Sequence, residues 1–174
     1  VVSEYTVTVE AGEEDKVQIV LDNVSVTNSS MPVIYVKSAD KVFVTTTEGS
    51  TNTLSVTGTF TADGTTNTDA VIFSKSDITL NGLGTLNISS SDNGVATKDD
   101  LKVTGGTYTF NCSGTALEAH DSIRIADGTI NIEKSNDGLH AEDDEDDTTG
   151  FIYIKDGTLT INSADDGIHG TTVI

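Results

Sequence analysis

The sequence contains very few of the residues that cross-link, kink or anchor a protein chain. Among 174 residues there are one cysteine, one proline and no tryptophan. With Cys112 alone, neither an intrachain disulfide nor a cysteine-based zinc site can form. Its place two residues after Phe110 predicts a buried, unreactive thiol. No apolar run approaches the roughly 18 residues of a membrane-spanning helix, so we expect no membrane insertion.

Positive charge is equally scarce. The chain has 9 lysines and arginines against 28 acidic residues, which gives a formal net charge of −19 at pH 7. Nucleic acids and anionic membrane surfaces would repel such a chain, so neither is expected as a partner. The N-terminus shows no basic segment followed by an apolar one, although a mature secreted chain would already have lost such a signal.

Short alternating apolar segments are abundant, and Thr, Ser, Asn, Asp and Gly separate them, which is typical of an all-β protein. In the second half these segments repeat. Gly-Thr pairs mark the repeat at intervals of 22, 22 and 29 residues, and the last interval contains a seven-residue insertion. The pairs are Gly84-Thr85, Gly106-Thr107, Gly128-Thr129 and Gly157-Thr158.

Alignment on these pairs places apolar residues in columns. A repeat of about 22 residues with two or three short strands predicts one coil of a parallel β-helix, whose turns stack about 4.8 Å apart. A β-sandwich also contains short alternating strands, but it has no reason to keep this register. The columns are Leu101, Ile123 and Ile152; Val103, Ile125 and Ile154; Leu86, Tyr108, Ile130 and Leu159; Ile88, Phe110, Ile132 and Ile161; and Val95, Leu117, Leu139 and Ile168.

We predict one parallel β-helix domain over residues 1–174, with less regular turns over 1–76 and regular turns over 77–174. Glycine at each corner suits a backbone with positive φ, and the stretch 57–69 is expected to protrude as a loop. No terminal cap is recognisable, so we expect a longer protein or a partner over the end, such as a second copy in a dimer. The strands expected in the first part are Val17–Leu21, Val24–Val26, Val33–Val36, Val42–Val44, Leu54–Val56 and Ala70–Phe73.

Acidic residues form further columns just after the third apolar position of each repeat. The seven-residue insertion lengthens the acidic run that begins at Glu142, adding Asp144, Glu145, Asp146 and Asp147. The residues that stack in register are Asp99 with Asp121 and Asp143, Asp137 with Asp166, and Glu118 with His140 and His169.

Carboxylates stacked at the spacing of neighbouring strands repel one another unless a cation neutralises them. They either stay solvated on a turn, where Asp-Gly and Asn-Gly are common, or bind a hard cation. Ca²⁺ accepts six to eight oxygen ligands in loose geometry, whereas Mg²⁺ requires a tighter octahedron. Repetition in register favours calcium.

The histidines in these columns, His140 and His169, raise the question of zinc. Structural zinc is disfavoured, because no cysteine belongs to the set and the neighbours are hard oxygen donors. We expect both to be hydrogen-bonding turn residues or members of a ligand-binding groove. Another column, Lys102, Arg124 and Tyr153, projects outward from the sheet. It is either a solubilising surface or a strip that meets an anionic or hydroxyl-rich polymer.

The segments Asn136-Asp137-Gly138-Leu139-His140-Ala141-Glu142-Asp143 and Asp165-Asp166-Gly167-Ile168-His169 resemble a clostridial family of carbohydrate-binding β-helix proteins, over about residues 77–171. The resemblance implies a right-handed parallel β-helix that binds calcium and acidic plant polysaccharide such as polygalacturonate (pectin). It also implies a secreted or cell-surface bacterial protein, similar in structure to calcium-dependent pectate lyases.

The calcium ligands implied by this resemblance are acidic residues of the columns. An acidic residue is missing at Asp92-Asn93-Gly94 and at Gly114-Thr115-Ala116, so a site on those turns is expected to be incomplete. Together with Glu142 from the acidic run, the expected ligands are Asp99, Glu118, Asp121, Asp137, Asp143, Asp165 and Asp166.

The favoured function is calcium-dependent, non-catalytic binding of acidic polysaccharide outside the cell, with cellulose as a second candidate polymer. A chain of charge −19 would repel polygalacturonate unless bound Ca²⁺ offered open coordination positions and Lys102 and Arg124 assisted. One alternative is a lyase, in which Lys98, Lys102 or Arg124 is the base beside the metal. Another is a surface repeat or adhesin that calcium merely stiffens.

Overall fold

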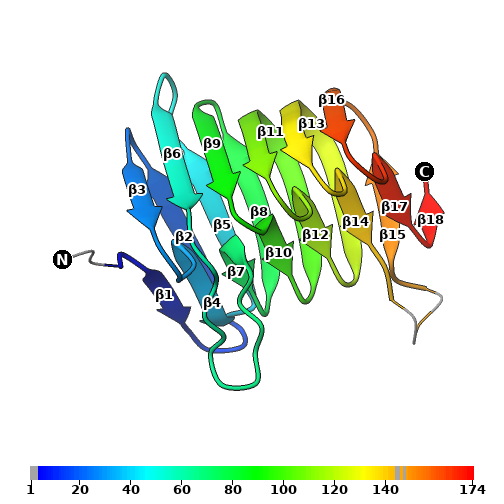
Figure 1. The fold of residues 1–174 in the computed structure, drawn as a ribbon. Helices are drawn as coiled ribbons and strands as arrows, with labels where there is room; N and C mark the ends of the chain where they lie inside the picture. Colours follow the sequence, from blue (N-terminus) through cyan, green and yellow to red (C-terminus); the bar gives the residue numbers. More distant parts are fainter. Residues whose placement is uncertain (1–3, 144–145, 147) are drawn as a thin grey trace.

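The computed structural model describes residues 4–143, 146 and 148–174, and these form strands and connecting segments without an α-helix. Parallel strands stack along one axis as a β-helix of about seven turns with coils of about 25 residues (Figure 1). The predicted fold class is confirmed, and so are its columns, because Leu101 pairs with Ile123 and Ile123 with Ile152. Within the described part of the chain, no helix is long and apolar enough to cross a membrane.

Each full turn contributes strands to three faces. Face A is a sheet of β1 (Val7–Glu10), β4 (Ile34–Ser38), β7 (Ala70–Ser74), β10 (Asn93–Thr97), β12 (Leu117–Ala119), β14 (Leu139–Ala141) and β17 (Ile168–Gly170). Face B contains β2 (Lys16–Leu21), β5 (Lys41–Thr46), β8 (Asp77–Gly82), β15 (Phe151–Ile154) and β18 (Thr172–Val173). Face C contains β3 (Ser25–Asn28), β6 (Thr51–Val56), β9 (Thr85–Ser90) and β16 (Thr158–Ser163). The long strands β11 (Asp100–Cys112) and β13 (Ser122–Ser135) run from face B into face C.

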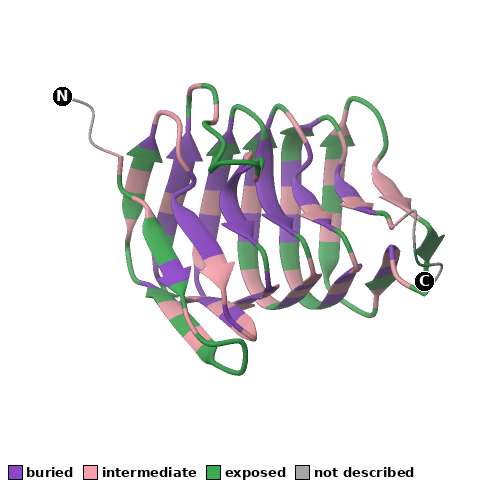
Figure 2. Ribbon diagram, turned by 90° about the horizontal axis from the view of Figure 1, so that it is seen from below, coloured by how far each residue is buried: buried purple, intermediate pink, exposed green. Residues whose placement is uncertain are grey.

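The inward side chains of all three faces pack into one apolar core. Figure 2 shows buried residues concentrated in the central turns and more exposed residues in the last turn. Phe110, Leu117 and Ile123 are fully buried, because side chains alternate between the interior and the outer surface along each strand. Cys112 is buried as predicted, and burial raises the pKa of its thiol to about 12, which leaves it protonated and unreactive.

Glycine lets the chain turn from face B to face C. At three of the four Gly-Thr pairs the glycine has a positive φ, as predicted. These are Gly106 (95°), Gly128 (119°) and Gly157 (108°). Gly84 is the exception, since Gly82 takes the positive φ of 116° in that turn. A Cβ on Gly84 would lie 2.3 Å from the Thr47 carbonyl oxygen, so close packing requires glycine there.

The predicted loop at 57–69 connects β6 to β7 and lies against the outer surface of face A. Its Asp63 accepts a hydrogen bond from the Tyr35 hydroxyl at 3.0 Å, and Lys37 Nζ lies 3.6 Å from the same carboxylate. The rings of Tyr35 and Phe73 pack edge to face with centroids 5.8 Å apart. They form a small second cluster with Ala70 and Ala96. The loop is therefore held by contacts rather than protruding freely.

Replacement of Phe110 by alanine should lower the free energy of unfolding by about 3–5 kcal/mol, because loss of a fully buried ring leaves a cavity in a closely packed interior. Urea unfolding followed by circular dichroism measures this loss. The control is Val20→Ala on the outer surface of β2, where the side chain is 54% exposed and the change should stay below about 0.5 kcal/mol. Equal effects of the two substitutions would contradict a core enclosed by the three faces.

Candidate functional site

The corner between face A and face B carries the acidic column Asp99, Asp121 and Asp143, which we name the acidic corner. The Asp121 backbone N–H donates to the Asp99 carbonyl at 3.4 Å, so these two residues stack as predicted. On the next turn, Gly150 N–H donates to the Asp121 carbonyl at 2.6 Å. The predicted acidic positions 144, 145 and 147 lie outside the described residues.

The Asp143 side chain lies close to Asp121, in agreement with the predicted column. Nδ1 of His120 is 2.9 Å from an Asp121 carboxylate oxygen and 3.7 Å from one of Asp143. One ligand atom from each of these three residues lies within 4.8 Å of the others. The hydrogen bond to Asp121 raises the pKa of the His120 imidazole, so positive charge is favoured at this point. His120 belonged to no column in the sequence, and only the fold places it here.

Asp99 is crowded by other carboxylates. The pKa of its carboxyl group is raised from the ordinary 3.8 to about 6, first by burial and then by Asp77, which accepts a hydrogen bond from it. Asp77 also contacts Lys41 Nζ at 2.8 Å. Burial and the neighbouring Asp77 both disfavour a negative charge on Asp99, and a bound cation would offset that cost. Deprotonated carboxylate oxygens are the ligands that a hard cation prefers, so the donor chemistry of the acidic corner fits Ca²⁺.

The predicted column of Glu118, His140 and His169 is confirmed by the register of β12, β14 and β17. The two histidines, which we name the histidine pair, lie within strands. The prediction of turn residues is therefore wrong, because stacking on β12 extends the strand through these positions. Their rings stack with centroids 4.6 Å apart and planes 7° apart. Glu118 accepts a hydrogen bond from Asn93 Nδ2 at 2.8 Å, and burial raises the pKa of its carboxyl group.

Three more predicted ligands surround the histidine pair. Asp137 accepts a hydrogen bond from the Asp166 backbone N–H at 3.1 Å, which confirms that these two stack. Their carboxylates approach the two rings from one side, and Glu142 approaches from the other. Asp165 is exposed, and its backbone N–H donates to the Asn136 carbonyl at 3.0 Å. Apart from Asp165, the predicted ligands thus divide into two groups, one at the acidic corner and one around the histidine pair.

Lys102, Arg124 and Tyr153 form a column on the outer surface of face B, as predicted, and we name it the cationic column. Asp100 balances both cations, since its Oδ2 lies 2.8 Å from Arg124 Nη1 and 3.5 Å from Lys102 Nζ. The sequence columns did not point to Asp100. Because it directly follows Asp99, the acidic corner and the cationic column meet along one edge of the β-helix.

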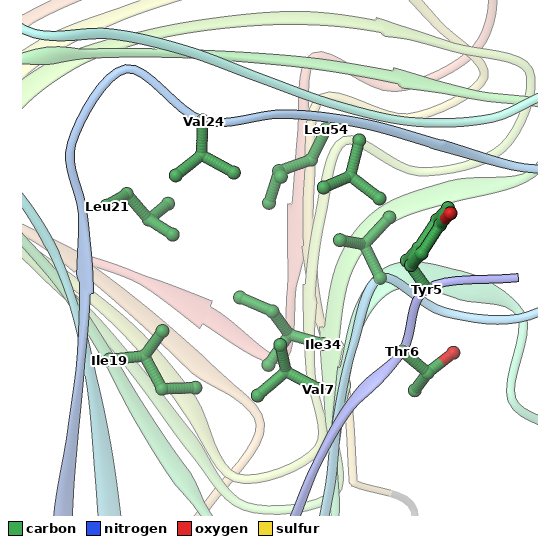
Figure 3. A pocket seen from close by; sticks show the side chains of 10 residues that line it. Tyr5, Thr6, Val7, Ile19, Leu21, Val24, Ile34 and Leu54 are labelled. Atoms are coloured by element: carbon green, nitrogen blue, oxygen red, sulfur yellow. The ribbon is translucent and has the colours of Figure 1, made fainter.

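A cavity of about 230 Å³ opens at the end of the β-helix that carries β1. Val7, Ile19, Leu21 and Leu54 point into it (Figure 3). This lining continues the apolar core and offers little to the hydroxyl groups of a sugar. We therefore place no carbohydrate site there.

Comparison with known proteins relates the whole chain to one family. The profile of a family described as carbohydrate-binding domain-containing protein matches residues 1–174. A carbohydrate-binding domain-containing protein of Acetivibrio thermocellus is 36% identical over 104 residues, which span 58% of this chain and 36% of that relative's length. The fold is similar to that of a polysaccharide lyase-like protein from C. thermocellum, solved as a gadolinium derivative. That similarity has a TM-score of 0.84 and 30% identity, and it covers 98% of this chain and 77% of the other.

The raised pKa of Asp99 predicts a pH-dependent stability. Between pH 3.8, its ordinary value, and about pH 6 the folded state binds more protons than the unfolded state, so stability falls as the pH rises through this window. In chelator, Asp99→Asn should therefore gain stability relative to the wild type at pH 7 but not at pH 4. Thermal unfolding at both pH values measures this, with exposed Asp165→Asn as the control. A difference that does not change with pH would contradict the assignment.

Proposed function

Because the chain belongs to the family of carbohydrate-binding domain-containing proteins, we propose that it binds an acidic polysaccharide such as polygalacturonate through calcium held at the acidic corner. The proposed binding is non-catalytic and takes place outside the cell. One observation carries the proposal: the acidic corner and the cationic column meet along one edge, where Asp99 precedes Asp100 and Asp100 contacts both Lys102 and Arg124.

Calcium would be held by two sets of carboxylates at this edge. Asp121 and Asp143 form one set, and Asp99 with Asp77 forms the other. Bound Ca²⁺ supplies positive charge and coordination positions that uronate carboxylates can share with the protein. Calcium near millimolar concentration outside cells would fill even weak sites. The structurally similar protein was solved with gadolinium, and Gd³⁺ is also a hard cation that prefers oxygen ligands.

The cationic column would position the sugar chain beside the metal. Arg124 and Lys102 offer N–H donors to uronate carboxylates, and Tyr153, which is 39% exposed, offers an aromatic surface. Because Asp100 already balances both cations, the column alone would attract a polyanion weakly. Calcium is therefore expected to control the affinity.

A lyase is the second candidate, because the similar solved structure is that of a polysaccharide lyase-like protein. Removal of the proton beside a uronate carboxylate requires a base close to the metal. Arg124 donates to Asp100 at 2.8 Å and its guanidinium lies 5.1 Å from the centre of the Phe151 ring. These contacts fix Arg124 along the sheet surface, which favours binding over proton removal.

Retention on insoluble polygalacturonate tests the proposal. The protein should be retained with calcium and released by chelator, and Asp121→Asn combined with Asp143→Asn should abolish retention. Arg124→Gln should weaken it by about fivefold, the scale of one exposed ion pair. Asp156→Asn, an exposed carboxylate on a different corner, serves as the control.

Three outcomes would overturn this function. Retention that is insensitive to chelator would mean that the protein binds the polysaccharide without calcium. No retention of the folded protein in either condition would favour a surface repeat that calcium only stiffens. Accumulation of unsaturated product, detected by ultraviolet absorbance at high protein and calcium, would favour the lyase.

A further inference from the structure

The histidine pair has a geometry that calcium does not explain. His140 in β14 and His169 in β17 pair directly in register, and their rings stack in parallel on the outer surface of face A. Each histidine follows an aspartate by three residues, in Asp137-Gly138-Leu139-His140 and in Asp166-Gly167-Ile168-His169. The same short motif on adjacent turns thus places two equivalent imidazoles side by side.

The two aspartates orient the rings. His169 Nδ1 lies 3.0 Å from an Asp166 carboxylate oxygen, and His140 Nδ1 lies 3.6 Å from one of Asp137. A carboxylate only accepts hydrogen bonds, so it favours the neutral tautomer with the proton on Nδ1. The lone pair of each imidazole then lies on Nε2. Carboxylates support metal-binding histidines in this way in many proteins.

Both Nε2 atoms face the same carboxylate. Oε2 of Glu142 lies 3.3 Å from His140 Nε2 and 3.9 Å from His169 Nε2. One ligand atom from each of the three residues lies within 4.8 Å of the others. Three electron-pair donors therefore face one point. A proton on one Nε2 satisfies a single contact, whereas a metal ion satisfies all three.

We propose that His140, His169 and Glu142 bind a borderline divalent transition ion, with Zn²⁺ as the representative, in a site separate from the acidic corner. Two imidazoles and one carboxylate suit Zn²⁺, Ni²⁺ or Cu²⁺, whereas Ca²⁺ prefers oxygen ligands alone. The three side chains are 28%, 41% and 45% exposed, so water or a second ligand can complete the coordination. This open arrangement differs from the closed structural zinc site that the sequence disfavours. Glu118, the neighbour of His140 on β12, adds a carboxyl group beside the site.

Calorimetric titration of the chain with Zn²⁺, in excess Ca²⁺ and above the ordinary histidine pKa of about 6.5, tests the proposal. Excess calcium occupies hard oxygen sites, so the zinc signal is separated from the acidic corner. One zinc ion should bind per chain. Asp166 supports a ligand rather than binding the metal, so Asp166→Asn should weaken zinc binding by about 10- to 100-fold. His140→Ala and His169→Ala each remove a ligand and should weaken zinc binding by at least as much.

The chain provides a matched control, since it has three histidines and His120 lies against carboxylates at the acidic corner. His120→Ala should reduce zinc affinity far less than His140→Ala or His169→Ala does. Unaltered zinc binding in the combined His140→Ala and His169→Ala variant would overturn the proposal, as would the absence of binding at millimolar Zn²⁺. Circular dichroism confirms the fold of each variant, and His169→Gln preserves side-chain volume if the alanine variant unfolds. These results do not depend on polysaccharide binding.

Discussion

Every feature of this protein depends on the stacking of one turn directly on the next. Parallel strand register places equivalent residues of successive turns side by side, so any side chain repeated in the sequence becomes a column in space. Repetition of Leu101, Ile123 and Ile152 is sufficient to build the core, because stacking these side chains removes apolar surface from water. Repetition of Asp99 and Asp121 brings like charges together, and these require a partner.

The type of partner differs between the two groups of carboxylates. At the acidic corner the donors are mainly carboxylate oxygens, and His120 supplies positive charge beside Asp121. Around the histidine pair the aspartates face imidazole Nδ1 atoms instead, and the open Nε2 atoms face Glu142. The two groups would therefore select different cations, a hard cation at the acidic corner and a borderline cation at the histidine pair, although the groups are only a few residues apart along the chain.

The features that the repeat determines could be predicted from the sequence, whereas the side-chain contacts at the corners of the β-helix could not. The period of the apolar columns was sufficient for the fold class and the register, and the Thr-, Gly- and Asn-rich composition of 57–69 indicated a loop. Asp100 and His120 were missed because neither belongs to a repeated column, and the apolar and acidic columns do not specify their side-chain contacts with Arg124 and Asp143 on the next turn. The histidines belonged to the predicted column, but a repeat alone does not separate a strand end from a turn.

Glu142 and Asp143 are consecutive residues, yet their side chains approach different groups: Glu142 the histidine pair and Asp143 the pair of His120 and Asp121. A cation bound through one of these carboxylates would fix the backbone conformation that both residues share. The other carboxylate would then already be positioned for its own cation, so the two proposed binding events would be thermodynamically linked. Such linkage is reciprocal, and each ion would change the affinity for the other by the same factor. Through this single dipeptide, the cation occupancy of one site would depend on the occupancy of the other.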